Sequence, residues 1–276
     1  QEKKDTTKTL EWVRSLKECN GLIGTYGFSY HGATQLLATP GTQPPNCMAP
    51  AMTGLDECKH WSCDGGAFWW HIGISWGLQL AAQQMKRKQN FSAWEKIKKS
   101  LEQKTYLREG LELLERHDPQ GMALKWLKNS SQENPKWNVH KPLKEFLKKP
   151  LLLIGGWWDP HLNGILDIYE QSIKAGGQPQ LHIGAATHLQ WWDDIYKTQL
   201  IFFKHHLQGI KDEIQHHSQL KLWNLTTKNW QTSLNIKESH SWALISNGLA
   251  CTHSEEGKIT SNGSGDGGVT IVHDPW

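Results

Sequence analysis

The sequence predicts an α/β protein with a parallel β-sheet covered by helices, and three observations lead to this prediction. Short apolar runs that precede helical patterns occur near Gly24 and again near Leu152, as in strand–helix–strand units. A long stretch rich in Lys, Glu and Leu separates the two regions, and short strand-like runs close the chain. We therefore expect a first core part, a helical cap, a second core part and a partial all-β domain, at residues 1–71, 72–149, 150–213 and 214–276.

The composition excludes several classes of protein. Of the 276 residues, 37% are hydrophobic and 21% are charged, which allows a sizeable core and argues against general disorder. The 30 basic and 27 acidic side chains nearly cancel, and the lysines are spread out, so no nucleic-acid partner is expected. The 16 tryptophans suit a core, or else a pocket for flat apolar ligands. We expect no membrane partner and a cytoplasmic protein, because no signal sequence and no long apolar run are present.

The five cysteines bear on the cellular compartment. Their number is odd, and the spacing of Cys58 and Cys63 in "CKHWSC" supplies only half of a zinc ligand set. Free thiols in a reducing compartment are therefore expected, with a Cys58–Cys63 disulfide as the open alternative. The cysteines are Cys19, Cys47, Cys58, Cys63 and Cys251.

The first core part reads as helix, strand, sharp turn and helix. Leu10, Val13 and Leu16 lie at helical spacing. "NGLIGTYGFS" then combines a turn with a short apolar strand, and "GATQLLAT" predicts the second helix. Between about residues 72 and 149, patterns such as "SAWEKIKKSLEQ" predict long helices. This segment is either a cap or an ordinary solvated helical segment, and it shows no chemistry of its own.

The second core part reads as a βαβ unit. "PLLLIGGWWDP" predicts a buried strand that ends at Asp159, and an amphipathic helix closed by glycines follows. "QLHIGAATH" predicts the next strand, which ends near His188, and a further helix covers the sheet. Such a unit requires parallel strands. After about residue 214 the pattern shortens, and "LKLWNLTTKNWQT" and "SWALISNG" predict the first strands of the all-β module.

Ser29 is the first candidate for catalysis. It lies in "GFSYHG", between a predicted strand and a predicted helix. In α/β-hydrolases the nucleophilic serine occupies a strained turn of this kind, flanked by glycines. Here the second glycine, Gly32, is displaced by one residue. The alternative is a serine that merely occupies a tight turn.

Asp159 and His188 supply the partners that a serine nucleophile needs. Both follow predicted parallel strands, so both are expected at the carboxyl edge of the sheet, where α/β folds carry their sites. The order Ser29, Asp159, His188 is the hydrolase order. Each partner has an alternative reading, a turn aspartate before proline or a histidine in a surface loop.

Neighbouring groups complete the prediction. The backbone N–H of Tyr30 follows the nucleophile and would donate to an oxyanion. His31 is a rival base, but adjacent residues of a helix point apart, so His188 is favoured. Two histidine pairs, His205-His206 and His216-His217, are expected to be exposed and to bind no metal.

At these residues the chain resembles the cocaine esterase-like hydrolases, also called the Xaa-Pro dipeptidyl-peptidase-like family. "CNGLIGTYGFSYHGATQLLAT" is similar to the family's nucleophile segment, which accounts for the displaced glycine. "WSCDGGAFWW" resembles an Asp-x-x-x-Gly-Ala-Phe stretch, "PLLLIGGWWDP" resembles the strand with the acid, and "LHIGAATH" resembles the segment with the base. The C-terminal segments resemble the beginning of a jelly-roll domain.

The resemblance implies an α/β-hydrolase with Ser29 as nucleophile, Asp159 as acid and His188 as base. Such enzymes cleave esters, amides or peptides after proline through an acyl-enzyme, without a cofactor. Asp64 falls where a substrate-binding carboxylate of related enzymes lies, with a turn aspartate as the alternative. Trp158 is the other candidate for substrate binding. The expected partner is a small ester, an amide or a short peptide, and a homo-oligomer is left open.

Two departures from the family pattern affect these expectations. Ala185 and Ala186 stand in place of Pro-Trp before the base. The resemblance implies that the family's first strands lie upstream of Gln1. The tyrosine that supplies a second oxyanion donor is expected there too. Most of the jelly roll is expected beyond Trp276. We therefore expect a fragment of an enzyme, and the alternative is a non-catalytic or truncated hydrolase-fold protein that binds ligand without turnover.

Overall fold

The structure, a computed structural model, describes residues 1–129, 137–210, 219–233, 242–245, 249–250, 258–261 and 270–271. The chain divides into two compact units, Gln1–Thr232 and Ser233–Trp276. The first unit contains the parallel sheet and all the residues of the candidate site.

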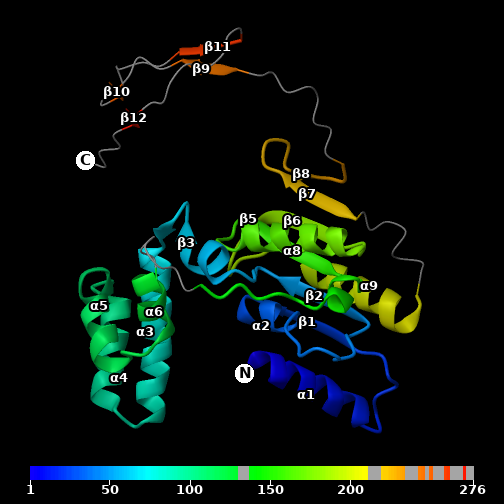
Figure 1. The fold of residues 1–276 in the computed structure, drawn as a ribbon, viewed down its shortest axis with the longest axis horizontal. Coiled ribbons are helices and arrows are strands. Elements are labelled where there is room, and N and C mark those ends of the chain that lie inside the picture. Colours follow the sequence, from blue (N-terminus) through cyan, green and yellow to red (C-terminus); the bar gives the residue numbers. More distant parts are fainter. Residues whose placement is uncertain are drawn as a thin grey trace. The chain divides into compact units, whose positions relative to one another are not determined.

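A six-stranded sheet forms the centre of the first unit, with the strand order β1-β2-β5-β6-β7-β8 (Figure 1). Every neighbouring pair from β1 to β7 is parallel, and only β8 runs antiparallel. The parallel α/β sheet predicted from the sequence is thereby confirmed. The strands are β1 (Gly24–Phe28), β2 (Cys47–Ala51), β5 (Leu152–Trp158), β6 (Gln180–Thr187), β7 (Leu220–Asn224) and β8 (Asn229–Gln231).

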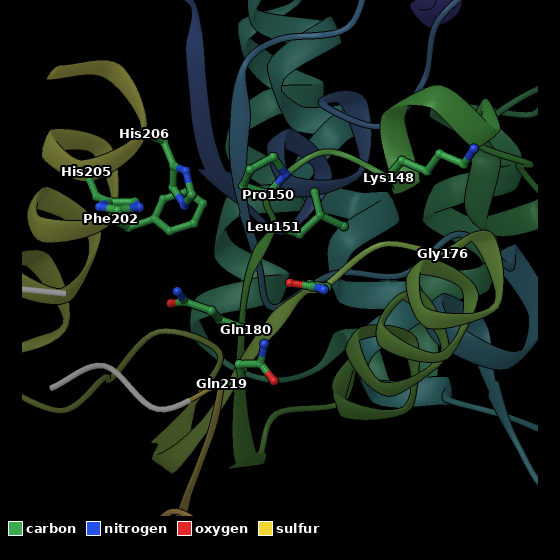
Figure 2. A pocket seen from close by; sticks show the side chains of 10 residues that line it. Lys148, Pro150, Leu151, Gly176, Gln180, Phe202, His205, His206 and Gln219 are labelled. Atoms are coloured by element: carbon green, nitrogen blue, oxygen red, sulfur yellow. The ribbon is translucent and has the colours of Figure 1, made fainter. Parts of the chain in front are cut away.

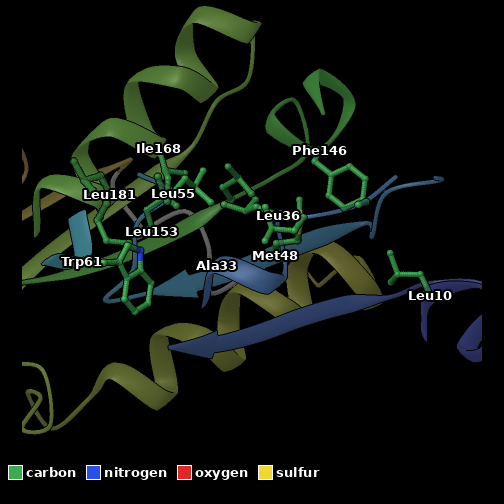
Figure 3. Packing of buried hydrophobic residues seen from close by; sticks show 14 of the residues in the cluster. Leu10, Ala33, Leu36, Met48, Leu55, Trp61, Phe146, Leu153, Ile168 and Leu181 are labelled. Atoms are coloured by element: carbon green, nitrogen blue, oxygen red, sulfur yellow. The ribbon is translucent and has the colours of Figure 1, made fainter. Parts of the chain in front are cut away.

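Helices cover both faces of this sheet. Alternate strand residues face opposite sides, so Leu153 packs with the helices α1, α2 and α8, whereas Leu152 packs with α9. Figure 3 shows the first of these two clusters, in which Leu153 and Ile168 of α8 lie close together. Strands buried on both faces are typical of parallel sheets. The helices are α1 (Glu2–Ser15), α2 (Tyr30–Thr34), α8 (Leu162–Ala175) and α9 (Ile195–Gln208).

The segment between the two core parts is helical. Its longest helix, α3, packs against α4, α5 and α6 around a separate apolar cluster that includes Ile74, Leu78 and Leu114 (Figure 1). Within the described ranges, none of the helices is both long and apolar enough to cross a bilayer. The helices are α3 (Trp70–Arg87), α4 (Phe91–Glu102), α5 (Tyr106–His117), α6 (Met122–Asn129) and α7 (Lys144–Leu147).

Three local elements differ from the sequence analysis. Strand β2 was not among the predicted strands, and it contains Pro50, a residue that is rare in central strands. Its residues are nevertheless all buried, and it pairs on both sides. A π-helix, Glu57–Ser62, leads into the small hairpin of β3 (Cys63–Asp64) and β4 (Ala67–Phe68). Helix α2 ends at Thr34, earlier than predicted, where the Gln35 side chain turns back to the carbonyls of Gly27 and His31.

The C-terminal part also differs from the predicted division at residue 214. Strands β7 and β8 belong to the main sheet, because the free edge of β6 pairs with β7, and the first unit extends to Thr232. In the second unit β9 pairs with β11 and β10 with β12. The jelly roll stays a prediction. These strands are β9 (Ala243–Ile245), β10 (Leu249–Ala250), β11 (Lys258–Thr260) and β12 (Thr270–Ile271).

Glu57 joins the π-helix to the helical segment. Its carboxylate accepts hydrogen bonds from Trp126 Nε1 at 3.0 Å and from Asn138 Nδ2 at 3.2 Å, and it lies 3.2 Å from His140 Nε2. Burial opposes ionisation of Glu57, but these hydrogen bonds outweigh it and hold the pKa of the carboxyl below its ordinary value. The charged form therefore fastens α6 and residues 137–140 to the π-helix.

We expect Glu57→Gln to lower the free energy of unfolding by about 1–3 kcal/mol at pH 7, since it removes charged hydrogen bonds. A carboxyl with a lowered folded pKa stabilises the protein above its unfolded pKa, and this contribution is lost as pH falls through the folded value. The difference from wild type, measured by urea unfolding, should therefore shrink near pH 3. Glu112→Gln, at an exposed ion pair with Arg116, is the control. If Glu57→Gln destabilised the protein equally at pH 7 and near pH 3, the lowered pKa of Glu57 would be contradicted.

Candidate active site

Ser29 occupies a strained turn between β1 and α2. Its backbone has φ 58° and ψ −131°, in a region that side chains rarely adopt. The N–H of Ser29 donates to the carbonyl of Ala51 at 2.9 Å, and the carbonyl of Ser29 accepts from the N–H of Gly32 at 2.9 Å. The neighbouring strand and the following helix therefore hold the turn in a conformation that an isolated serine would avoid.

The two glycines of the motif are required by close packing. A Cβ at Gly32 would lie 2.8 Å from the Ala51 carbonyl oxygen and 2.9 Å from Thr53 Cβ. A Cβ at Gly27 would lie 2.9 Å from His31 Cβ. The displaced second glycine is therefore the position at which α2 crosses closest to the end of β2.

A continuous chain of hydrogen bonds joins the three predicted residues. His188 Nε2 lies 3.0 Å from Ser29 Oγ, and His188 Nδ1 lies 2.7 Å from Asp159 Oδ1. The Asp159 side chain is fully buried, and that of His188 is 25% exposed. A carboxylate can only accept, so Nδ1 carries the proton and Nε2 is free to accept from the serine hydroxyl. The arrangement suits transfer of a proton from Ser29 to His188.

The parallel sheet brings these residues together. Ser29 follows β1, Asp159 follows β5 and His188 follows β6, so all three lie at the carboxyl edge. At β5 a register irregularity between Gly156 and Trp158 precedes the acid. The sequence predicts this juxtaposition, and the structure places the three side chains in hydrogen-bond contact.

Aromatic side chains that the sequence analysis did not single out surround the histidine. Phe28 lies with its ring centroid 5.5 Å from that of His188 and 5.7 Å from that of Trp191. Trp191 Nε1 also donates to the carbonyl of His188 at 3.1 Å. Trp191 therefore holds the loop that carries His188. The signal in the sequence was the abundance of tryptophan, for which a pocket for flat apolar ligands was one of two expectations.

Tyr30 and His31 begin helix α2 directly after Ser29. The N–H of Tyr30 has no acceptor among the described residues, as expected for the first residue of a helix. Its hydroxyl donates to Glu2, and burial with the charge of Glu2 raises the pKa of Tyr30 to about 12. His31 is exposed and makes no hydrogen bond with Ser29 in the described structure. His188, which the sequence favours over His31 as the base, makes the contact to the serine hydroxyl.

The two predicted substrate-binding residues differ in their positions. Trp158 is the last residue of β5, directly before Asp159, and its side chain is 58% exposed. Asp64 is exposed and lines a separate cavity of about 370 Å³ with the π-helix residues Cys58, Lys59 and His60. That cavity has none of the three hydrogen-bonded residues in its wall. Asp64 as a substrate ligand stays a prediction.

The His205-His206 pair differs from the expectation of exposure. Both rings are partly buried, because His206 packs on Phe202 with ring centroids 4.6 Å apart. Burial lowers the pKa of His206 to about 4. The pair His216-His217 lies outside the described residues. In the described ranges no group of three or more potential ligands is arranged to hold a metal ion.

These two histidines line a cavity of about 470 Å³ at the other edge of the sheet (Figure 2). Leu151, Gln180 and Gln219 contribute to its wall just before or at the beginning of β5, β6 and β7. The amino ends of the strands lie here, whereas Ser29 follows the carboxyl end of β1. This larger cavity is therefore separate from the candidate active site.

The described cysteines are all free. They are Cys19, Cys47, Cys58 and Cys63, and Cys251 lies outside the described residues. Burial raises the pKa of Cys47 to about 12, and burial with the neighbouring Cys63 raises that of Cys58 to about 11. The Cys58–Cys63 disulfide left open by the sequence is not formed in this structure.

The family model for the X-Pro dipeptidyl-peptidase (S15 family) matches residues 1–190. A search of curated proteins gives no match.

Two solved structures illustrate the likeness of fold. A CocE/NonD family hydrolase from Staphylococcus aureus has 15% sequence identity and a TM-score of 0.57, over 88% of this chain and 40% of that chain. An aminopeptidase from the marine sediment archaeon Thaumarchaeota archaeon has 13% identity and a TM-score of 0.56, over 94% of this chain and 46% of that chain. The chain thus spans less than half the length of each of these proteins.

The strain at Ser29 generates a prediction about stability. We expect Ser29→Gly to have a free energy of unfolding about 1 kcal/mol higher than Ser29→Ala, because glycine tolerates a positive φ. Both variants lose the hydrogen bond to His188, so the difference between their free energies of unfolding reports the backbone strain at position 29. Denaturant unfolding of the two variants measures it. Equal stability would mean that the turn is not strained.

Proposed function

The chain belongs to the X-Pro dipeptidyl-peptidase (S15) family, and on this premise we propose that it is a serine hydrolase acting on an ester or amide. One observation carries the proposal, the hydrogen-bonded series Ser29–His188–Asp159 at 3.0 Å and 2.7 Å. Serine hydroxyls are weak nucleophiles at neutral pH and need such a base, itself oriented by an acid. Family and geometry therefore support the same chemistry.

In the first half of the proposed reaction, Nε2 of His188 takes the proton of Ser29 as Oγ attacks the substrate carbonyl carbon. The buried carboxylate of Asp159 accepts from Nδ1 and stabilises the imidazolium that forms. General base catalysis of this kind contributes about 10²–10⁴-fold in rate. The N–H of Tyr30 has no acceptor among the described residues, so it is available to donate to the developing oxyanion.

In the second half, the tetrahedral intermediate collapses as the imidazolium gives its proton to the leaving alkoxide or amine. The acyl group stays on Ser29 Oγ. Water then attacks the ester carbonyl while His188 takes a proton from it, and the imidazolium returns that proton to Ser29 Oγ as the acyl product leaves. The proton transfer within the protein joins Ser29 Oγ and His188 Nε2, which lie 3.0 Å apart, and no cofactor is called for.

The proposed substrate is an acyl ester, an amino acid ester or an Xaa-Pro peptide. The exposed side chain of Trp158 beside Asp159, and Phe28 beside His188, would offer an apolar surface to its acyl or ring portion. The similarity to X-Pro dipeptidyl-peptidases and to the archaeal aminopeptidase favours a peptide or amide.

Labelling with a fluorophosphonate probe tests the reaction class. We expect the wild-type protein to be labelled at Ser29, Ser29→Ala to be unlabelled, and His188→Ala to react at least about 10²-fold more slowly. His31→Ala is the matched control, because His31 is exposed on the same elbow and should not change the rate. Gel fluorescence and peptide mapping give the readout. Folded wild-type protein that binds ligands without labelling would instead support the non-catalytic alternative.

A substrate panel tests the class of bond that is cleaved. The panel compares a short-chain aryl ester, an amino acid ester and an Xaa-Pro anilide. If the proposal is correct, at least one is hydrolysed with loss of turnover in Ser29→Ala, and Trp158→Ala mainly raises KM because it removes ground-state binding. Turnover that persists in Ser29→Ala would rule out the acyl-enzyme on this residue.

A further inference from the structure

His161 is a buried histidine that the hydrolase chemistry above does not use. It is 5% exposed and lies two residues after Asp159, at the beginning of α8. Its Nδ1 lies 2.5 Å from the backbone carbonyl oxygen of His60. A carbonyl oxygen only accepts, so Nδ1 of His161 carries a proton and donates it.

His161 contacts both partners of the serine. Its backbone N–H donates to Asp159 Oδ2 at 3.2 Å, while Oδ1 of the same carboxylate faces His188. Its ring meets that of His188 edge to face, with centroids 4.9 Å apart. On another side its ring packs on the ring of Trp61, with centroids 4.4 Å apart. His161 therefore contacts both the carboxylate of Asp159 and the imidazole of His188.

The surroundings of the His161 ring favour its neutral form. Burial lowers the pKa of His161, and the neighbouring histidines act in the same direction, against the carboxylate of Asp159 and the bond to His60. A neutral ring adds no repulsion to the imidazolium that His188 forms when it takes a proton. A positively charged side chain at this position would oppose that step.

The acceptor of His161 is itself firmly held. The buried ring of His60 accepts the N–H groups of Leu55 and Asp56 on Nδ1, each at 3.1 Å. Asp56 Oδ1 in turn caps the first turn of the π-helix that contains His60. The carbonyl of His60 thus lies on a rigid irregular helix, of the kind that is common at functional sites.

We propose that His161 is a positioning residue for the Asp159–His188 pair. Its side-chain bond to the His60 carbonyl fixes the backbone at residue 161, and the N–H of that residue orients the Asp159 carboxylate toward His188. The π-helix thereby serves as a support for the candidate active site. The inference rests on the proposed function, since it assigns the residue a part in that reaction, but its geometry can be tested apart from turnover.

Two substitutions separate the donor from the packing. His161→Phe keeps an aromatic ring and loses the donor, whereas His161→Asn carries an amide N–H near the position of Nδ1 and loses the ring. We expect His161→Phe to slow fluorophosphonate labelling about 10-fold, since small misplacements of catalytic groups are costly. His161→Asn should stay within about 3-fold of wild type. On an aryl ester the loss should fall on kcat rather than KM.

Proton NMR supplies a readout that needs no turnover. The Nδ1 proton of His188, shared with Asp159, should give a far-downfield signal in the wild type that disappears in His188→Gln. We expect it to be lost or broadened in His161→Phe and retained in His161→Asn, with thermal melts confirming that both variants fold. Retention in His161→Phe, or absence in the folded wild type, would overturn the inference. A wild type that shows the signal but does not label would count against the proposed function alone.

Discussion

Parallel pairing of β1, β2, β5 and β6 is the constraint on which the candidate site depends. Ser29 and Asp159 are separated by the whole helical segment, yet both follow strands of one parallel sheet. Because parallel strands end at the same edge, the residues after β1, β5 and β6 meet there. A change of strand order would leave each of them as an ordinary loop residue.

The elbow shows how packing maintains a conformation that the local sequence disfavours. The Ser29 N–H bonds to β2 at Ala51, and Gly32 lets α2 approach that same carbonyl closely. The cost of a positive φ at a serine, on the order of 1–3 kcal/mol, is offset by this fixed framework. Strain of this type keeps the hydroxyl at the end of the strand, where His188 Nε2 lies 3.0 Å from it.

The π-helix Glu57–Ser62 links the two halves of the first unit. At its beginning Glu57 fastens α6 and residues 137–140, and near its end the His60 carbonyl holds His161. The helical segment and the candidate site therefore share one small irregular element. Asp64 follows the same element, on the side of its separate cavity.

By itself the sequence determined the parallel α/β class, the strands that end at Asp159 and His188, and the elbow at Ser29. These features follow from local patterns, namely apolar runs of strand length, amphipathic helices and glycines in a turn. Tertiary structure alone decided that Pro50 lies in a central strand, that β7 and β8 join the main sheet, and that His161 lies against His188. Each depends on which distant backbone or ring is adjacent, and contacts between residues far apart in the chain leave no periodic signal along it.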